Sequence, residues 1–211
     1  RVYNLNENFK NYFKSYDFHN LYKELLNFCT VELSAFYFDI RKDSLYCDPK
    51  NFERRESCII VLNIILESLI KWFAPILSFT TEEIYTLINQ DKKSIHLEKF
   101  IEFPKSFKNE KLNKKWRELR KIRDICNISI ETKRASKEIG SSLEASLTIN
   151  LGEKLFDITK DIDFSELCIT SVAKVNKTDS AEISAVSTKA EGKKCPICWK
   201  INKNRCERHP V

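Results

Sequence analysis

The sequence predicts a mainly α-helical protein, with an antiparallel helix bundle, a long helix, a small α/β unit and a short cysteine-rich tail. Over residues 1–140, apolar side chains recur every three or four positions, which is the spacing of one helix face. Alternation at every second position, typical of strands, begins only after that stretch. Short links between helices favour antiparallel neighbours. We therefore divide the chain into residues 1–104, 105–140, 141–188 and 189–211.

Residues 56–74 form the most apolar stretch, and we expect them to be the central helix of the bundle. Asn63, Glu67 and Lys71 leave one narrow polar stripe. Such a helix should be surrounded, because each exposed large apolar side chain forgoes roughly 1.5 to 3 kcal/mol of burial. A membrane span is the alternative, but the polar stripe interrupts it and Pro75 ends it at about the minimum length for crossing a bilayer.

Two helices are predicted ahead of this central helix. The first covers residues 5–16, and Asp17 is a suitable cap for the second. The second helix should run from Phe18 to about Ile40. Asp48 then precedes a proline, which disfavours helical backbone and breaks the chain.

A further helix is predicted over residues 81–89. Thr80 and Glu83 have the spacing of a capping box, in which each side chain bonds the backbone of the other residue. Phe79 and Ile84 lie at the positions of a hydrophobic staple. Both signals mark the start of the same helix.

A long basic helix should follow an extended passage, beginning near Ser106 and stopping at Gly140. Residues 105–138 carry twelve basic and five acidic side chains, and residues 189–211 carry seven and two. Two such basic patches favour a polyanionic partner. For any single residue, an ordinary solvated face is the alternative.

The part after the long helix has a mixed pattern. Leu147, Ile149 and Leu151 alternate as in a strand. A short helix is expected next, and two more strands should follow; their ranges are 153–160, 169–175 and 183–186. The sequence therefore predicts a small α/β unit.

The tail contains the one constellation of metal ligands that the sequence indicates: Cys195, Cys198, Cys206 and His209. Two cysteines separated by two residues can bind one ion from a tight turn, and the second pair completes a tetrahedron. We expect one structural zinc, since four protein ligands leave no position for a catalytic water. Unrelated thiols and a chance histidine are the alternative. The other five cysteines are scattered singly, which suits a reducing cytoplasm.

No catalytic signature stands out. With three glycines in the chain there is no phosphate-cradling loop, and no nucleophile, base and acid fall into a known pattern. The chain starts at Arg1 and contains no methionine, so we expect it to be a piece of a longer polypeptide.

Residues 17–48, DFHNLYKELLNFCTVELSAFYFDIRKDSLYCD, resemble the anticodon-binding region of bacterial isoleucyl-tRNA synthetases, a family of class I aminoacyl-tRNA synthetases. The likeness continues in order through four shorter segments, APILSFTTEEIY, KWRELRKIRD, IGSSLEA and KCPICW. The last of these is similar to the zinc knuckle that ends the family's chains. That knuckle usually has four cysteines, whereas His209 takes the fourth position here.

The resemblance implies a non-catalytic module that grips the anticodon arm of the isoleucine tRNA. The enzyme would attach isoleucine using ATP and magnesium, through catalytic and editing domains upstream of this chain. We expect that upstream domain and the tRNA as partners, a monomer and no membrane. From the charge pattern, the expected tRNA contacts are Arg117, Arg120, Lys121, Arg123, Lys133, Arg134, Lys137, Lys200, Arg205 and Arg208. Trp199 is a further expected contact, because it directly follows a predicted zinc ligand and could stack on an unpaired base.

Three alternatives remain open at this point. A helical, zinc-containing scaffold for protein partners would show no salt-sensitive affinity for RNA. A DNA-repair glycosylase ends in a similar knuckle but needs a catalytic N-terminal proline, which is missing here. Valyl and leucyl synthetases share the bundle but generally lack the knuckle. Trp199 itself is either a stacking platform for a base or an apolar cover that packs the knuckle against the α/β unit.

Overall fold

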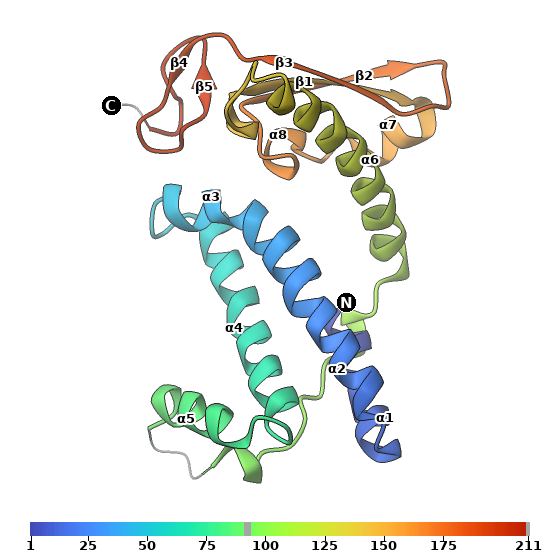
Figure 1. The fold of residues 1–211 in the computed structure, drawn as a ribbon, viewed down its shortest axis with the longest axis vertical. Coiled ribbons are helices and arrows are strands. Elements are labelled where there is room, and N and C mark those ends of the chain that lie inside the picture. Colours follow the sequence, from blue (N-terminus) through green and yellow to red (C-terminus); the bar gives the residue numbers. More distant parts are fainter. Residues whose placement is uncertain (91–93, 210–211) are drawn as a thin grey trace. The chain divides into compact units, whose positions relative to one another are not determined.

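The computed structural model describes residues 1–90 and 94–209 (Figure 1). It is mainly helical, with a small sheet. Its contacts divide the chain into two compact units, residues 1–109 and residues 110–211. The finer division into four segments stays a prediction.

The first unit is helical. Its elements are α1 (Val2–Ser15), α2 (Phe18–Asn27), the π-helical segment η1 (Phe28–Phe38), α3 (Asp39–Cys47), α4 (Glu53–Phe73), α5 (Ser78–Ile88) and the 3₁₀ turns η2 (Ile95–Leu97) and η3 (Lys105–Phe107). The segments from α2 to α3 follow one another as a long helix beside α4 (Figure 1). The core joins α1, α2, η1 and α4, and is formed by Leu5, Phe9, Leu21, Leu25, Phe28, Leu33, Ile65 and Trp72.

The second helix starts as predicted and ends later. The Asp17 side chain accepts a hydrogen bond from the Asn20 amide, which confirms the cap. The helix passes through the π-helical segment and continues to Cys47, so the predicted end near Ile40 is wrong. A π-helix bonds each amide to the carbonyl five residues earlier, which disturbs the 3.6-residue pattern on which that end was judged. The break at Asp48 is confirmed, since its backbone is extended.

The central helix α4 is not surrounded, contrary to expectation. It packs against α1, α3 and α5, and buries Cys58, Ile65 and Trp72. These neighbours leave several apolar side chains of α4 exposed: Ile60 is 60% exposed, and Ile59, Val61 and Leu66 are also exposed. Among the described residues, none of the helices has the length and apolarity required to cross a membrane.

Helix α5 forms, but its predicted cap does not. The helix begins at Ser78 with Leu77 at the N-cap, where no side chain bonds the backbone. Thr80 lies inside the helix and Phe79 is 93% exposed, so the capping box and the staple are wrong. The amide of Leu77 already bonds the Phe73 carbonyl, and this turn leads the chain from α4 directly into α5.

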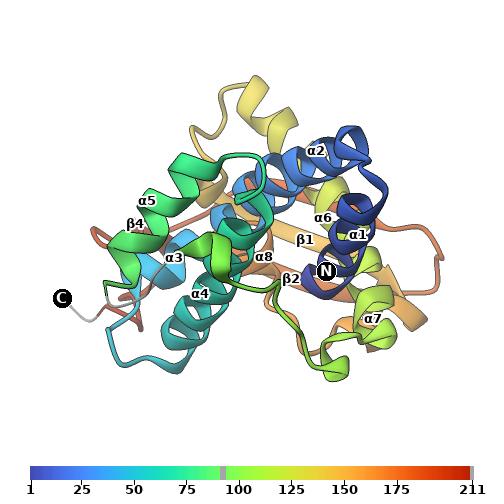
Figure 2. The same ribbon diagram turned by 90° about the horizontal axis from the view of Figure 1, so that it is seen from below.

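The second unit combines helices with a sheet. It contains α6 (Glu110–Ala135), the 3₁₀ turn η4 (Ser142–Glu144), β1 (Ala145–Gly152), α7 (Glu153–Thr159), α8 (Phe164–Leu167), β2 (Val172–Thr178), β3 (Ser184–Lys189), β4 (Lys193–Lys194) and β5 (Ile201–Asn202). The strand order is β2-β1-β3, with β1 parallel to β2 and antiparallel to β3. Strands β1 and β2 lie side by side in both views (Figure 1 and Figure 2).

The alternating strand β1 is confirmed, because Leu147, Ile149 and Leu151 are fully buried on one face. Helix α6 packs against β3 and β1. It begins at Glu110, a few residues after Ser106, and it ends at Ala135 before the predicted stop at Gly140.

Candidate functional site

The cysteine-rich tail is a short hairpin. Strands β4 and β5 pair in antiparallel fashion. In the turn between them, the Cys195 amide bonds the Lys200 carbonyl and the Trp199 amide bonds the Cys195 carbonyl. Gly192 has a φ of 130°, and a Cβ atom there would lie 2.1 Å from the Asn202 carbonyl oxygen. Only glycine permits so close an approach of the two strands.

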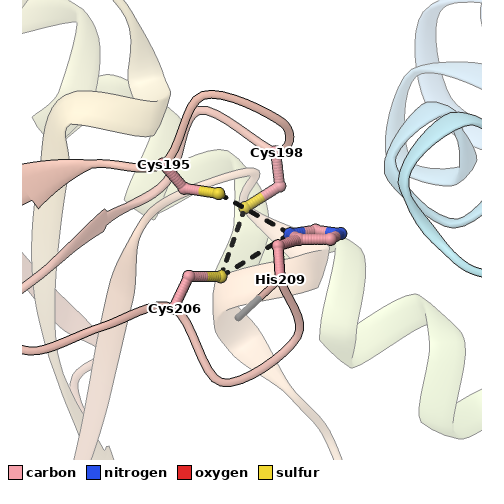
Figure 3. A group of neighbouring side chains, drawn as sticks. All are labelled: Cys195, Cys198, Cys206 and His209. Carbon is pink, nitrogen blue, oxygen red and sulfur yellow. Dashed lines mark hydrogen bonds between the residues drawn. The ribbon is translucent and has the colours of Figure 1, made fainter. Parts of the chain in front are cut away.

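The turn carries Cys195 and Cys198, and the segment after β5 brings Cys206 and His209 against them (Figure 3). The sulfur atoms of Cys198 and Cys206 lie 3.9 Å apart. Nδ1 of His209 lies 3.6 Å from the sulfur of Cys195 and 3.6 Å from that of Cys206. All four donor atoms lie within 4.8 Å of one another, which is close enough to hold one metal ion.

The surroundings of Cys195 favour the thiolate form of its side chain. Burial acts to raise the pKa of Cys195, but the backbone amides of Cys198 and Ile197 and the side chains of Cys198 and His209 outweigh it. The pKa of Cys195 is lowered to about 6. Metals bind the thiolate and not the thiol. Burial raises the pKa of Cys198 to about 12, so without a metal the surroundings favour the thiolate at Cys195 and not at Cys198.

Two hydroxyls, those of Ser171 and Ser165, connect the hairpin to the rest of the second unit. Oγ of Ser171 accepts a 2.6 Å hydrogen bond from the Ile201 amide and donates to the Leu143 carbonyl. Nearby, Nζ of Lys200 donates to Oγ of Ser165 at 3.3 Å. The metal-binding turn therefore has a defined position within the second unit.

The basic residues predicted on the long helix lie on α6 or just after it. Several of them have partners: Lys121 pairs with Glu118, Lys133 with Glu138, and Arg134 with Glu131. Arg123 is half-buried, and its Nε donates to the Leu167 carbonyl, which joins α6 to α8. Arg117, Arg120 and Lys137 are exposed.

A second group of cations surrounds the hairpin. Lys200, Lys203, Arg205 and Arg208 line a pocket of about 390 Å³, together with Asn202 and Asn204. Trp199 is 59% exposed, so it is not a core residue of its unit. Nζ of Lys194 lies 5.3 Å from the centre of the indole ring, which is cation–π distance.

Comparison of the sequence with known proteins identifies the family to which the chain belongs. A family model described as the anticodon-binding domain of tRNA ligase matches residues 1–149, which include the whole first unit, α6 and most of β1. The chain belongs to this family of anticodon-binding domains.

Three curated relatives of this anticodon-binding domain are isoleucine–tRNA ligases. That of Pelagibacter ubique is 74% identical over 209 residues, covering 99% of this chain and 23% of the relative. Those of Agrobacterium fabrum and Rhodopseudomonas palustris are each 38% identical and cover 90% of this chain. The chain spans less than a quarter of the length of each relative.

The anticodon-binding domain also has a pocket that the sequence did not indicate. It has a volume of about 520 Å³ and lies where η1, α3 and the start of α4 meet. Its lining residues come from positions 37–61 and form no motif. A single signal was present, the aromatic Phe52 in an otherwise polar turn after the break at Asp48.

Proposed function

We propose that this chain is the part of an isoleucine–tRNA ligase that grips the anticodon arm of its tRNA. The observation that carries the proposal is the 74% identity over nearly the whole chain to an isoleucine–tRNA ligase, together with the family match. The parent enzyme would attach isoleucine using ATP and magnesium elsewhere in its length, and this part performs no catalysis. A monomer in the cytoplasm stays our prediction.

The metal of the hairpin is zinc in this proposal. Zinc bonds to sulfur at about 2.3 Å and to nitrogen at about 2.0 to 2.1 Å, so a tetrahedron around it has edges of about 3.8 Å between sulfurs and about 3.6 Å between sulfur and nitrogen. The distances of 3.9 Å and 3.6 Å agree with both values. A bound zinc would stabilise the hairpin, whose small size provides little core of its own.

Phosphate contacts supply most of the RNA affinity in this proposal. On α6 and just after it we assign them to Arg117, Arg120, Lys121, Lys133, Arg134 and Lys137, and around the hairpin to Lys200, Arg205 and Arg208. Arg123 contributes charge while it holds α8. Trp199 stacks on an unpaired base, which its exposed face supports.

The test is filter binding of the purified chain to the isoleucine tRNA over a range of salt concentrations. Arg117→Ala should weaken binding and reduce the slope of log affinity against log salt by about 0.9, because one phosphate contact is lost. Lys154→Ala removes an exposed positive charge from α7 and should leave the slope unchanged. A tRNA with an altered anticodon should bind more weakly than the native one.

The outcome separates the proposal from a scaffold for protein partners. A scaffold for protein partners would show no salt-dependent affinity for the native tRNA or for the altered one. Equal affinity for the native and the altered tRNA would show that the chain does not recognise the anticodon, even if it binds both tRNAs.

A further inference from the structure

The pocket of about 520 Å³ in the first unit has an exposed aromatic side chain at its edge. Phe52 is 50% exposed and occupies the N-cap position of α4. Its amide bonds the Pro49 carbonyl at 3.1 Å, and its own carbonyl accepts from the amides of Arg55 and Glu56 at 2.9 and 3.0 Å. These bonds fix the backbone that carries the ring.

The turn that carries Phe52 is rigid for a second reason. Arg54 forms a two-pronged ion pair with Asp48, at 2.8 and 2.9 Å, and reaches Asp43 at 3.3 Å. Only 2% of the Asp48 side chain is exposed. Nε of Arg55 donates to the Leu45 carbonyl at 3.0 Å. Bidentate pairs of this kind define both position and orientation, so the backbone that carries the ring is held in place before any ligand arrives.

Another part of the pocket wall combines an aromatic ring and a cation. The guanidinium carbon of Arg41 lies 6.0 Å from the centre of the Tyr37 ring. The Tyr37 hydroxyl lies 3.8 Å from the sulfur of Cys58. Burial and then Cys58 raise the pKa of Tyr37 to about 12, so the hydroxyl keeps its proton at neutral pH. Glu53 and Ser57 are exposed polar side chains among the lining residues.

We propose that this pocket receives one unpaired nucleobase from the loop of the bound RNA, stacked on Phe52, with Arg41 and Glu53 in contact with its polar edge. The inference deepens the proposed function and rests on it. An aromatic face together with a few polar groups is the usual means of holding a splayed-out base of single-stranded RNA.

The charges of the pocket favour a base over a phosphate. Arg54 is paired with two carboxylates, and Glu53 adds a further negative charge to a lining that also includes Arg41. A phosphate would meet this carboxylate, whereas the amino group of a base can donate a hydrogen bond to it. Stacking also requires a ring whose face is accessible, which the exposure of Phe52 provides.

The test uses an anticodon stem-loop of the isoleucine tRNA with 2-aminopurine placed at one loop position at a time. Stacking quenches the fluorescence of 2-aminopurine, so the wild-type chain should quench it strongly at the position that this pocket binds, besides the position that stacks on Trp199. Phe52→Ala should abolish this quenching and weaken binding about fivefold to a hundredfold, the range for loss of one base–aromatic stack. Phe52→Trp should preserve both.

Phe79→Ala is the matched control, because Phe79 is 93% exposed on α5 and lies outside the pocket. It should leave affinity and quenching within twofold of wild type. Arg41→Gln should reduce the preference for the native base at the quenched position over the other three bases. Circular dichroism checks that each variant keeps its helical content.

The possible results are distinct. If Phe52→Ala binds the stem-loop as tightly as wild type and quenches it equally, the pocket proposal is wrong and the proposed function stands. If the wild-type chain binds no tRNA, the proposed function itself fails. If free nucleoside monophosphates displace the stem-loop at micromolar concentrations, the pocket serves mononucleotides and the assignment to an RNA loop is overturned.

Discussion

At the scale of single residues, the first unit depends on a buried polar side chain. Asn6 is 1% exposed, and its Oδ1 accepts a 3.0 Å hydrogen bond from Nε1 of the fully buried Trp72. Its Nδ2 donates to the Ile101 carbonyl at 2.7 Å. One amide therefore joins α1, α4 and the chain after η2, and it satisfies polar groups that would otherwise be costly to bury.

We predict that Asn6→Ala lowers the free energy of unfolding of the first unit by about 2 to 4 kcal/mol. The change leaves the indole N–H and the Ile101 carbonyl without these partners, and each buried orphan costs about 1 to 3 kcal/mol. Urea denaturation followed by tryptophan fluorescence measures the loss. Asn11→Ala, at an exposed position of the same helix, should change stability by less than about 0.5 kcal/mol. Equal losses in the two variants would contradict this role.

At the scale of elements, the sequence predicted helices where the 3.6-residue pattern is regular and failed where a helix departs from it. The start of α2 and the strand β1 follow from a cap and an alternation that act locally. The π-helical segment Phe28–Phe38 has no such local signal. The start of α5 depends on the turn that directly follows the end of α4, in which the Leu77 amide bonds the Phe73 carbonyl. These features are set by packing and by backbone bonds to preceding residues.

The end of α6 is a further departure, and it provides a test. Lys137 has a φ of 59°, the left-handed conformation that ends a helix and that glycine adopts most easily. The amides of Lys137 and Glu138 bond the carbonyls of Arg134 and Lys133. Lysine occupies this position although Gly140 follows three residues later, which is why the predicted stop was misplaced.

Lys137→Gly should therefore raise the free energy of unfolding of the second unit by about 1 kcal/mol, because glycine has no Cβ penalty in this conformation. Lys114→Gly, at an exposed interior position of α6, should lower it by about 1 kcal/mol. Thermal unfolding of the two variants compares the signs directly. Destabilisation by both changes would show that Lys137 gains more from its side chain than it loses in its backbone.

At the scale of the whole molecule, the two units should respond separately to loss of metal. The four ligands come from the tail, and the core of the first unit contains none of them. We predict one zinc per chain by elemental analysis, and removal by a chelator should unfold the hairpin while most of the helical circular dichroism remains. Cys195→Ser should lose the metal, whereas Cys47→Ser should keep it. Less than half an equivalent of zinc in the wild type would contradict the prediction.

The metal ligands could be predicted from the sequence, whereas the RNA-binding surface could be predicted only in part and the pocket not at all. Four ligands within fifteen residues are a local pattern, and the structure brings their donor atoms together. The RNA surface is different, because a count of charges does not tell which cations are already engaged. Arg123, for example, bonds a backbone carbonyl of α8. The pocket beside Phe52 could not be predicted, since its walls meet only after η1, α3 and α4 have packed.

The double role of the Ser171 hydroxyl has a mechanical consequence. One oxygen accepts a hydrogen bond from the Ile201 amide of the hairpin and donates one to the Leu143 carbonyl ahead of β1. It therefore links the hairpin, the segment before β1 and the segment before β2. A force that a bound ligand exerts on the hairpin therefore reaches the start of β1 and β2 through the Ser171 hydroxyl as well as through the connection from β3 to β4. We therefore expect the hairpin and the sheet to shift together when a ligand binds the hairpin.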